Sequence, residues 1–145
     1  MNRDEIKNIL PHREPMLLID EVSLTDDEGI KASVASYYVR GDEYFLQGHF
    51  PGNPVVPGVI LCEMMGQSAC ALVMNAAKGA MPYFTGLDKV RFKQKVLPGD
   101  TIKFRSILLK SRPPFYFVQS EGYVGEKLCA RGELSFALLK DEAGA

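Results

Sequence analysis

One of the two histidines of this chain lies in a loop that is rich in proline and glycine. His49 belongs to the stretch GHFPGNPVVPG, residues 48–58. Three prolines fix backbone angles along this stretch: Pro51, Pro54 and Pro57. A loop restricted in this way holds an imidazole in one position, which a general base needs and a solvent-facing histidine does not. A histidine that only bonds to neighbouring backbone is the alternative, and the stiffness of the loop favours the base.

A carboxylate follows in an apolar segment, fourteen residues after His49. Glu63 belongs to VILCEMMGQSACALVMNAA, residues 59–77, where most neighbours are aliphatic or contain sulfur. On a helix such neighbours leave little polar surface, so the carboxyl group would be partly desolvated and its protonated, proton-donating form accessible. Gln67, four residues further on, is placed to hold the carboxyl group by a hydrogen bond. The alternative is a water-facing carboxylate near the beginning of the helix, where the helix dipole favours it.

Gly58 stands where this loop becomes a helix. The first N–H groups of a helix have no partner within it, and the positive end of the helix dipole lies behind them. Such a donor suits a substrate carbonyl oxygen that becomes negative in a transition state. A glycine that is needed only for packing is the alternative, and the two roles are compatible.

A base, an acid and an oxyanion donor together indicate proton abstraction beside a carbonyl, coupled to the loss of a neighbouring group. Removal of water from a 3-hydroxyacyl thioester needs this set, because the proton is weakly acidic and the hydroxyl leaves poorly unless it is protonated. Base and acid assistance are each worth about 10²–10⁴-fold. Loss of one oxyanion donor costs roughly 2.7–4 kcal/mol.

Other chemistries fit the sequence less well. His12 and His49 show neither HxxH nor HxxxH spacing, and the three cysteines show no CxxC spacing, so we expect no metal site. The patterns GxSxG, GxGxxG and GxxxxGK[ST] are absent, which removes the commonest hydrolase, dinucleotide and nucleotide triphosphate signals. Cys62, beside Glu63, lacks a basic partner and is expected to be inert.

The composition is that of an ordinary soluble globular protein, with 46% hydrophobic and 24% charged residues. The formal net charge of -1 gives no general attraction to nucleic acid or membrane. Residues 56–77 are long enough to suggest a membrane span, but Glu63 and Gln67 near the middle would be costly there. The N-terminus lacks the apolar region of a secretory signal, and the odd number of cysteines suits a reducing compartment. We expect a cytoplasmic protein with one domain, residues 1–145.

One segment offers a local basic surface. Four positive residues alternate with others along it: Lys89, Arg91, Lys93 and Lys95. Because alternate residues of a strand share a face, the pattern predicts one strand face with four positive charges. A docking patch for an acidic partner and an ordinary solvated face are equally compatible with the pattern.

The elements that must position these residues follow from the apolar periodicity and the turn residues. A short helix capped by Asn2 is predicted to end at Pro11. A long helix is predicted from about Pro57 to Lys78. Strands are predicted over residues 15–25, 30–39, 83–96, 101–110, 115–124 and 127–140.

A helix that is apolar nearly all round must be covered on most sides. Strands joined by tight turns form a largely antiparallel sheet, which can curl around such a helix. We therefore predict an α+β fold of the hot-dog type, with a curved antiparallel sheet wrapped around one long central helix. The sheet would have edges, and pairing with a second copy would cover them, so a homodimer is expected.

The stretch HFPGNPVVPG, followed by a helix with Glu63 and Gln67, resembles the (3R)-3-hydroxyacyl-acyl-carrier-protein dehydratases of bacterial type II fatty-acid synthesis, of the FabZ type. The resemblance extends over nearly the whole chain, through LPHREPMLLIDEV, GLDKVRF, VLPGD and GELSFAL. Relatives of the FabA type carry aspartate at the helix position, so Glu63 places this chain nearer to FabZ.

The resemblance implies a role for each candidate residue. His49 would take the C2 proton of the substrate, with its imidazole oriented by the Val55 carbonyl. Glu63 of the partner subunit would deliver a proton to the departing hydroxyl, with Gln67 as its support. The Gly58 N–H would hold the thioester carbonyl. The resemblance also implies a hot-dog fold, a trimer of dimers, no cofactor, and a substrate carried by acyl carrier protein, whose acidity favours docking on the basic segment.

Three alternatives remain open at this point. Some FabZ-type enzymes also isomerise trans-2 to cis-3 enoyl chains with the same His/Glu pair. A catalytically silent hot-dog domain would bind acyl chains or carrier protein without turnover, and a hot-dog thioesterase would use a different loop. The turn at residues 112–115 and the sulfur-rich helix are unusual for the family, and they leave the preferred acyl chain length open. His12 belongs to the resemblance, and we expect it to be structural.

Overall fold

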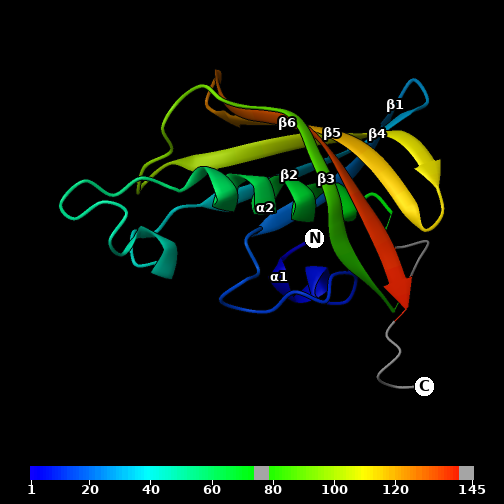
Figure 1. The fold of residues 1–145 in the computed structure, drawn as a ribbon, viewed down its shortest axis with the longest axis horizontal. Coiled ribbons are helices and arrows are strands. Elements are labelled where there is room, and N and C mark those ends of the chain that lie inside the picture. The colour runs from blue at the N-terminus through cyan, green and yellow to red at the C-terminus, as the bar shows by residue number, and fades with distance from the viewer. Residues whose placement is uncertain (74–78, 141–145) are drawn as a thin grey trace.

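The computed structural model describes residues 1–73 and 79–140 of the chain. Its helices and strands follow one another as drawn in Figure 1. They are α1 (Arg3–Ile6), β1 (Glu21–Asp27), β2 (Ile30–Tyr38), the 3-10 helix η1 (Tyr44–Leu46), α2 (Gly58–Cys70), β3 (Ala80–Phe92), β4 (Thr101–Arg112), β5 (Phe115–Val124) and β6 (Lys127–Lys140).

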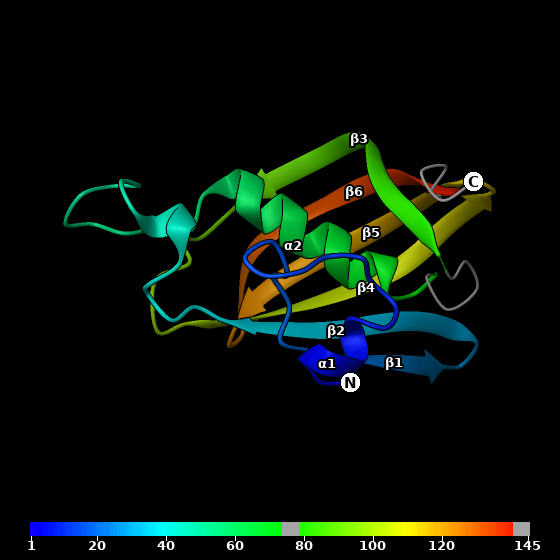
Figure 2. The same ribbon diagram turned by 90° about the horizontal axis from the view of Figure 1, so that it is seen from below.

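The six strands form one antiparallel sheet, in the order β1-β2-β4-β5-β6-β3. The sheet is curved, α2 lies along its concave side, and β3 bends over the helix (Figures 1 and 2). The segment between α1 and β1 crosses the side of α2 that the sheet leaves uncovered (Figure 2). The predicted α+β hot-dog architecture is therefore confirmed. The sheet does not close, because β1 and β3 each have one neighbouring strand.

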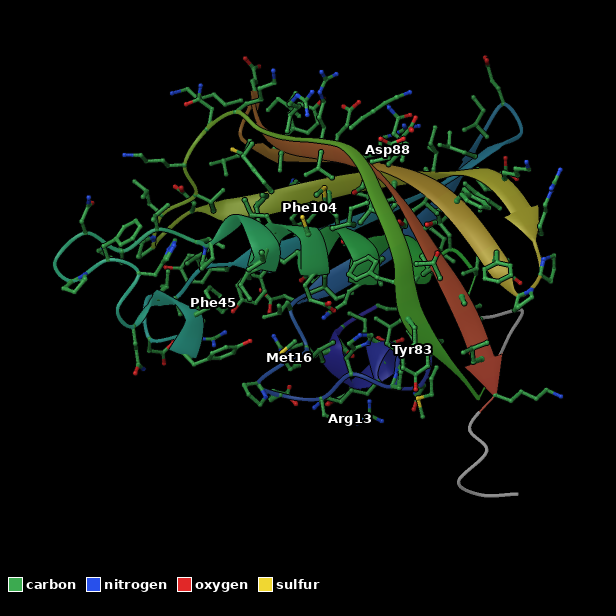
Figure 3. All side chains as sticks on the ribbon, in the orientation of Figure 1. Arg13, Met16, Phe45, Tyr83, Asp88 and Phe104 are labelled. Atoms are coloured by element: carbon green, nitrogen blue, oxygen red, sulfur yellow. The ribbon has the colours of Figure 1, made fainter. Side chains whose placement is uncertain are left out.

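The core lies between α2 and the sheet. Met64, Met65 and Ala69 of the helix are fully buried, as expected for a helix that is apolar nearly all round. Phe104 of β4 lies between the sheet and α2 (Figure 3). Phe104 is opposite Gly122 of β5. A Cβ atom on Gly122 would lie 2.7 Å from the Phe104 ring. The close packing of the large ring thus requires a glycine on the neighbouring strand.

Both helices are shorter than predicted. The helix α1 begins with the expected cap at Asn2, whose side chain accepts the Glu5 N–H, but it ends at Ile6 rather than Pro11. The helix α2 ends at Cys70, and residues 71–73 form a turn. The rest of the helix predicted to Lys78 falls on residues outside the described ranges. No helix in the described part of the chain is both long and apolar enough to cross a bilayer.

Four of the predicted strands have different limits, and those predicted over 30–39 and 101–110 end at Tyr38 and Arg112. The strand predicted over 15–25 spans Glu21–Asp27, because several backbone groups before it bond to groups outside any strand. The Met16 carbonyl and the Leu18 N–H both bond to the side chain of Gln67 on α2. The strand predicted over 83–96 begins at Ala80 and ends at Phe92.

Candidate active site

His49 lies on a long loop that projects from one end of the helix and sheet (Figures 1 and 2). Its Nδ1 is 3.0 Å from the carbonyl oxygen of Val55, and the Val55 N–H donates to the His49 carbonyl at 2.9 Å. Because a carbonyl only accepts, Nδ1 carries the hydrogen, and Nε2 of the neutral ring keeps its lone pair. The His49 imidazole, which also stacks on Phe50 at 4.3 Å between ring centroids, is therefore held in a tautomer that leaves Nε2 able to accept a proton.

The beginning of this loop is anchored by a buried carboxylate. Glu43 accepts hydrogen bonds from the Tyr37 hydroxyl at 2.7 Å, the Gly41 N–H at 2.7 Å and the Arg40 N–H at 3.0 Å. Burial alone would raise the pKa of Glu43, but these donors outweigh it and hold the pKa below its usual value. Burial and the hydrogen bond to Glu43 raise the pKa of Tyr37. The anchor keeps the first turn of the loop on the sheet.

Gln67 fixes the position of Glu63 on α2. The Gln67 side chain is buried, and its Oε1 accepts the Leu18 N–H at 2.8 Å. Its Nε2 donates to the Met16 carbonyl at 2.7 Å and to Oε2 of Glu63 at 2.8 Å. Since one partner can only donate and another can only accept, the amide has a single possible orientation. The hydrogen bond predicted between Gln67 and Glu63 is therefore present, with Gln67 as the donor.

Glu63 and Gln67 line a small cavity of about 40 Å³. The segment before β1, the helix α2, and the strands β3 and β6 contribute to its wall: His12, Glu63, Gly66, Gln67, Cys70, Pro82, Tyr83, Phe84 and Phe136. The Glu63 side chain is 24% exposed, which fits the expected partial desolvation. The structure thus brings Glu63 and Gln67 together, but His49 of the same chain is not among the residues around this cavity.

His12, which we expect from the sequence to be structural, also lines this cavity. Its Nε2 lies 3.5 Å from Oε2 of Glu63. The two residues are far apart in the sequence, and no local spacing rule connects them. The only sequence signal for His12 was its place in the LPHREP stretch of the family resemblance.

Gly58 is the first residue of α2, and Pro57 before it provides no side-chain cap. The Gly58 N–H makes no hydrogen bond within the described residues 1–73 and 79–140. A Cβ atom at this position would lie 3.0 Å from the ring of Phe92, so close packing also favours glycine. Gly58 therefore has both a free N–H donor and tight packing, so the roles of oxyanion donor and of packing residue are compatible.

The basic segment differs from the prediction. Lys89 and Arg91 are on β3, but the register shifts between Asp88 and Arg91, and Lys89 has a positive φ of 53°. The strand ends at Phe92, so Lys93 and Lys95 lie beyond it. The prediction of one strand face with four charges was therefore wrong, because the register shift and the early strand end break the alternation. All four side chains are exposed.

The cysteines do not form a reactive site. Cys62, Cys70 and Cys129 are free and buried. Burial raises the pKa of the Cys62 thiol and of the Cys70 thiol, with a further contribution from the Glu63 carboxylate, which disfavours a nucleophilic thiolate. Among the residues that the structure describes, no group of three or more His, Cys, Asp or Glu side chains is arranged to hold a metal ion.

Sequence comparisons with known proteins agree on one family. A family model described as a FabA-like domain matches residues 10–133. The 3-hydroxyacyl-[acyl-carrier-protein] dehydratase FabZ of Clostridium perfringens is 43% identical over 141 residues, which are 95% of this chain and 99% of that protein. The protein of the same name from Clostridioides difficile is 41% identical over 143 residues, 97% of this chain and 99% of its own.

Solved structures share the fold at lower identity. A dehydratase heterocomplex, ApeI:P from Xenorhabdus doucetiae, aligns with a TM-score of 0.80 and 21% identity, covering 95% of this chain and 92% of that one. A putative thioesterase from Lactococcus lactis aligns with a TM-score of 0.67 and 14% identity, covering 98% and 100%. These likenesses establish the architecture only.

The Glu43 anchor gives a prediction about stability. Tyr37→Phe should lower the free energy of unfolding at pH 7 by about 1.5–3 kcal/mol, because the carboxylate loses a hydrogen bond. The pKa of Glu43 is lower in the folded state, so this stabilisation is present above the usual carboxyl pKa and is lost as the pH falls through the folded value. Chemical denaturation of both proteins at neutral and acidic pH would measure it.

The matched control is Tyr38→Phe at the neighbouring position, where the side chain is 49% exposed. This change should leave the stability nearly unaltered. A loss for Tyr37→Phe that stays constant from pH 7 to about pH 3 would contradict a charged Glu43 as the partner.

Proposed function

Because this chain belongs to the FabA-like family, we propose that it removes water from (3R)-3-hydroxyacyl-[acyl-carrier-protein] to give trans-2-enoyl-[acyl-carrier-protein] in type II fatty-acid biosynthesis. It is then a hydro-lyase of the FabZ type, with residues 1–145 as one domain and the cytoplasm as its location. The observation that carries the proposal is the similarity to FabZ dehydratases over nearly the full chain, together with a His49 imidazole arranged as a base.

In the proposed reaction, Nε2 of His49 takes the proton from C2 of the substrate. The electron pair left on C2 is shared with the thioester carbonyl, whose oxygen becomes negative and accepts the Gly58 N–H. The C3–O bond then breaks as Glu63 transfers its proton to the hydroxyl, and water and the enoyl thioester are released. His49 ends the cycle with one proton more and Glu63 with one fewer, and exchange with solvent restores both.

We propose that the base and the acid of one site come from two copies of the chain. His49 lies on the projecting loop and is not among the residues that line the cavity with Glu63, which supports a second copy as the source of the base. The strand β3 is an edge strand of 13 residues. Several of its large apolar side chains are at least 43% exposed: Tyr83, Phe84, Leu87 and Phe92. An edge of this length and character favours pairing with a second copy, and three such dimers form the proposed hexamer.

The acyl carrier protein is the proposed partner, and its docking surface is the basic segment. Lys89 and Arg91 line a shallow hollow on the sheet together with Arg131, so three cations face one acid there, Glu133. Lys89 lies 3.7 Å from Glu133, and both groups are exposed enough for solvent to weaken this pair. A net positive surface remains for an acidic partner, with Lys93 and Lys95 on the adjoining segment.

Turnover of a 3-hydroxyacyl carrier-protein substrate tests the proposed chemistry. We expect wild-type protein to form trans-2-enoyl product, and His49→Ala and Glu63→Gln to lower kcat by about 10²–10⁴-fold each, because each removes a proton-transfer group. Glu126→Gln, in the exposed turn before β6, is the matched control and should remain fully active.

The products also separate the alternatives. Absence of turnover by wild-type protein that still binds the carrier would support a silent binding domain. A cis-3 product that accumulates beside the trans-2 product would support the bifunctional dehydratase and isomerase. Undiminished turnover by His49→Ala would contradict the proposed mechanism.

The docking surface gives a separate prediction. The double variant Lys89→Glu, Arg91→Glu should raise KM for the carrier-bound substrate roughly 5- to 30-fold at low ionic strength and leave kcat nearly unchanged. The effect should shrink as salt is added. The same acyl group on a short pantetheine thiol should be turned over equally by variant and wild type. Lys31→Glu, on β2 near the opposite edge of the sheet, is the control; a KM change shared by both variants would argue against a local surface.

A further inference from the structure

His12 lies in the segment between α1 and β1 and faces the acid on α2. Its side chain is 19% exposed, and its Nε2 is 3.5 Å from Oε2 of Glu63. Its other ring nitrogen, Nδ1, is buried and is the only such side-chain atom without a hydrogen-bond partner in the described part of the chain. A buried polar atom without a partner is uncommon in folded proteins, and it limits the states that the ring can adopt.

The groups around the Glu63 carboxyl are few. Gln67 cannot exchange protons, and all three of its polar positions are already bonded. The other titratable groups around the cavity are the Cys70 thiol of α2 and the Tyr83 hydroxyl of β3. Arg13, next to His12, directs its guanidinium to the carbonyls of Leu10, His12 and Lys7 rather than into the cavity. His12 is therefore the basic group that faces the acid.

The buried Nδ1 indicates how the His12 ring is protonated. A doubly protonated imidazolium would leave a buried Nδ1–H with no acceptor, and a neutral ring with its hydrogen on Nδ1 would do the same. The second form would also turn a lone pair towards the carboxyl oxygen of Glu63. A neutral ring with its hydrogen on Nε2 avoids both the buried Nδ1–H and the lone pair directed at Glu63. Only the Nδ1 lone pair then lacks a partner, and the Nε2–H faces Oε2.

We propose, on the basis of the proposed dehydratase function, that His12 is a positioning residue for the acid, a neutral imidazole whose Nε2–H joins Gln67 in donating to Oε2 of Glu63. With two donors directed at Oε2, the proton of the acid form resides on Oε1. That proton passes to the substrate hydroxyl as the Oε1–H bond breaks and a new O–H bond forms. The carboxylate that develops is stabilised by both donors, and the contact from His12 shortens as the charge grows.

Two variants of His12 test this role. His12→Leu removes the donor and should lower kcat by about 10-fold or more, with little change in KM, because a hydrogen bond to a developing charge is lost. The acid is then weaker, so the alkaline limb of the kcat profile should move to higher pH by about one unit. His12→Gln, whose amide N–H can reach the place of Nε2, should recover most of the rate and the original profile.

The Glu63→Gln background separates this role from a general effect on the fold. There, His12→Leu should change the residual rate by less than about 2-fold, because the group through which His12 acts is gone. An equal loss in both backgrounds, an unshifted alkaline limb, or His12→Gln as slow as His12→Leu would overturn the proposal.

The protonation state of the His12 ring can be measured without an activity assay. A ¹⁵N NMR spectrum of wild-type protein at neutral pH should show that the His12 ring carries its hydrogen on Nε2 and that Nδ1 is not protonated. The other tautomer or an imidazolium would overturn the proposal. Wild-type protein that shows the expected tautomer but forms no enoyl product would refute the dehydratase function instead, so the two failures are distinguishable.

Discussion

The side-chain amide of Gln67 is the interaction on which the acid half of the site depends. It joins helix α2 to the segment that covers it, through the Met16 carbonyl and the Leu18 N–H, and its third bond reaches Glu63. Because these partners allow only one orientation of the amide, the carboxyl group always meets a donor at Oε2. Two of these three bonds satisfy backbone groups that no strand pairs with, and the third holds Glu63, so fold and site share one set of contacts.

The base half is held by different means and on a different part of the fold. His49 is fixed by Val55 and Phe50 within a proline-rich loop, and the loop is tied to the sheet through Glu43 and Tyr37. The helix is packed inside the curved sheet, whereas the loop extends beyond its end (Figure 1). One chain therefore holds each half through a separate set of contacts, and our proposal joins the two halves through a second copy rather than through a motion of the loop.

Much of this arrangement could be predicted from sequence, because it depends on local rules. The strands at 115–124 and 127–140 follow alternation and turn residues, and the bond between Gln67 and Glu63 follows helical spacing. The end of α2 could not be predicted, since helix-forming residues continue past Cys70. Residues 15–20 have the apolar pattern of a strand, but they cover α2 instead, and only tertiary packing decides between the two.

Within the site too, tertiary contacts decide what the local sequence does not. The register shift between Asp88 and Arg91 has no marker in the sequence, so the alternation of basic residues predicts a single strand face that β3 does not have. His12 approaches Glu63 only because the segment before β1 folds across the helix (Figure 2). Local sequence patterns do not predict contacts between residues that are far apart in the sequence. The contact between His12 and Glu63 is one of these.

The central claim is that each active site takes its imidazole from one copy and its carboxyl group from another. Co-production of His49→Ala and Glu63→Gln chains tests it most directly, because a mixed dimer then contains one site with both groups intact. With random pairing, the mixture should recover about one quarter of the wild-type activity, although each variant alone is nearly inactive. A mixture no more active than its parents, in mixed dimers verified by mass, would contradict the claim.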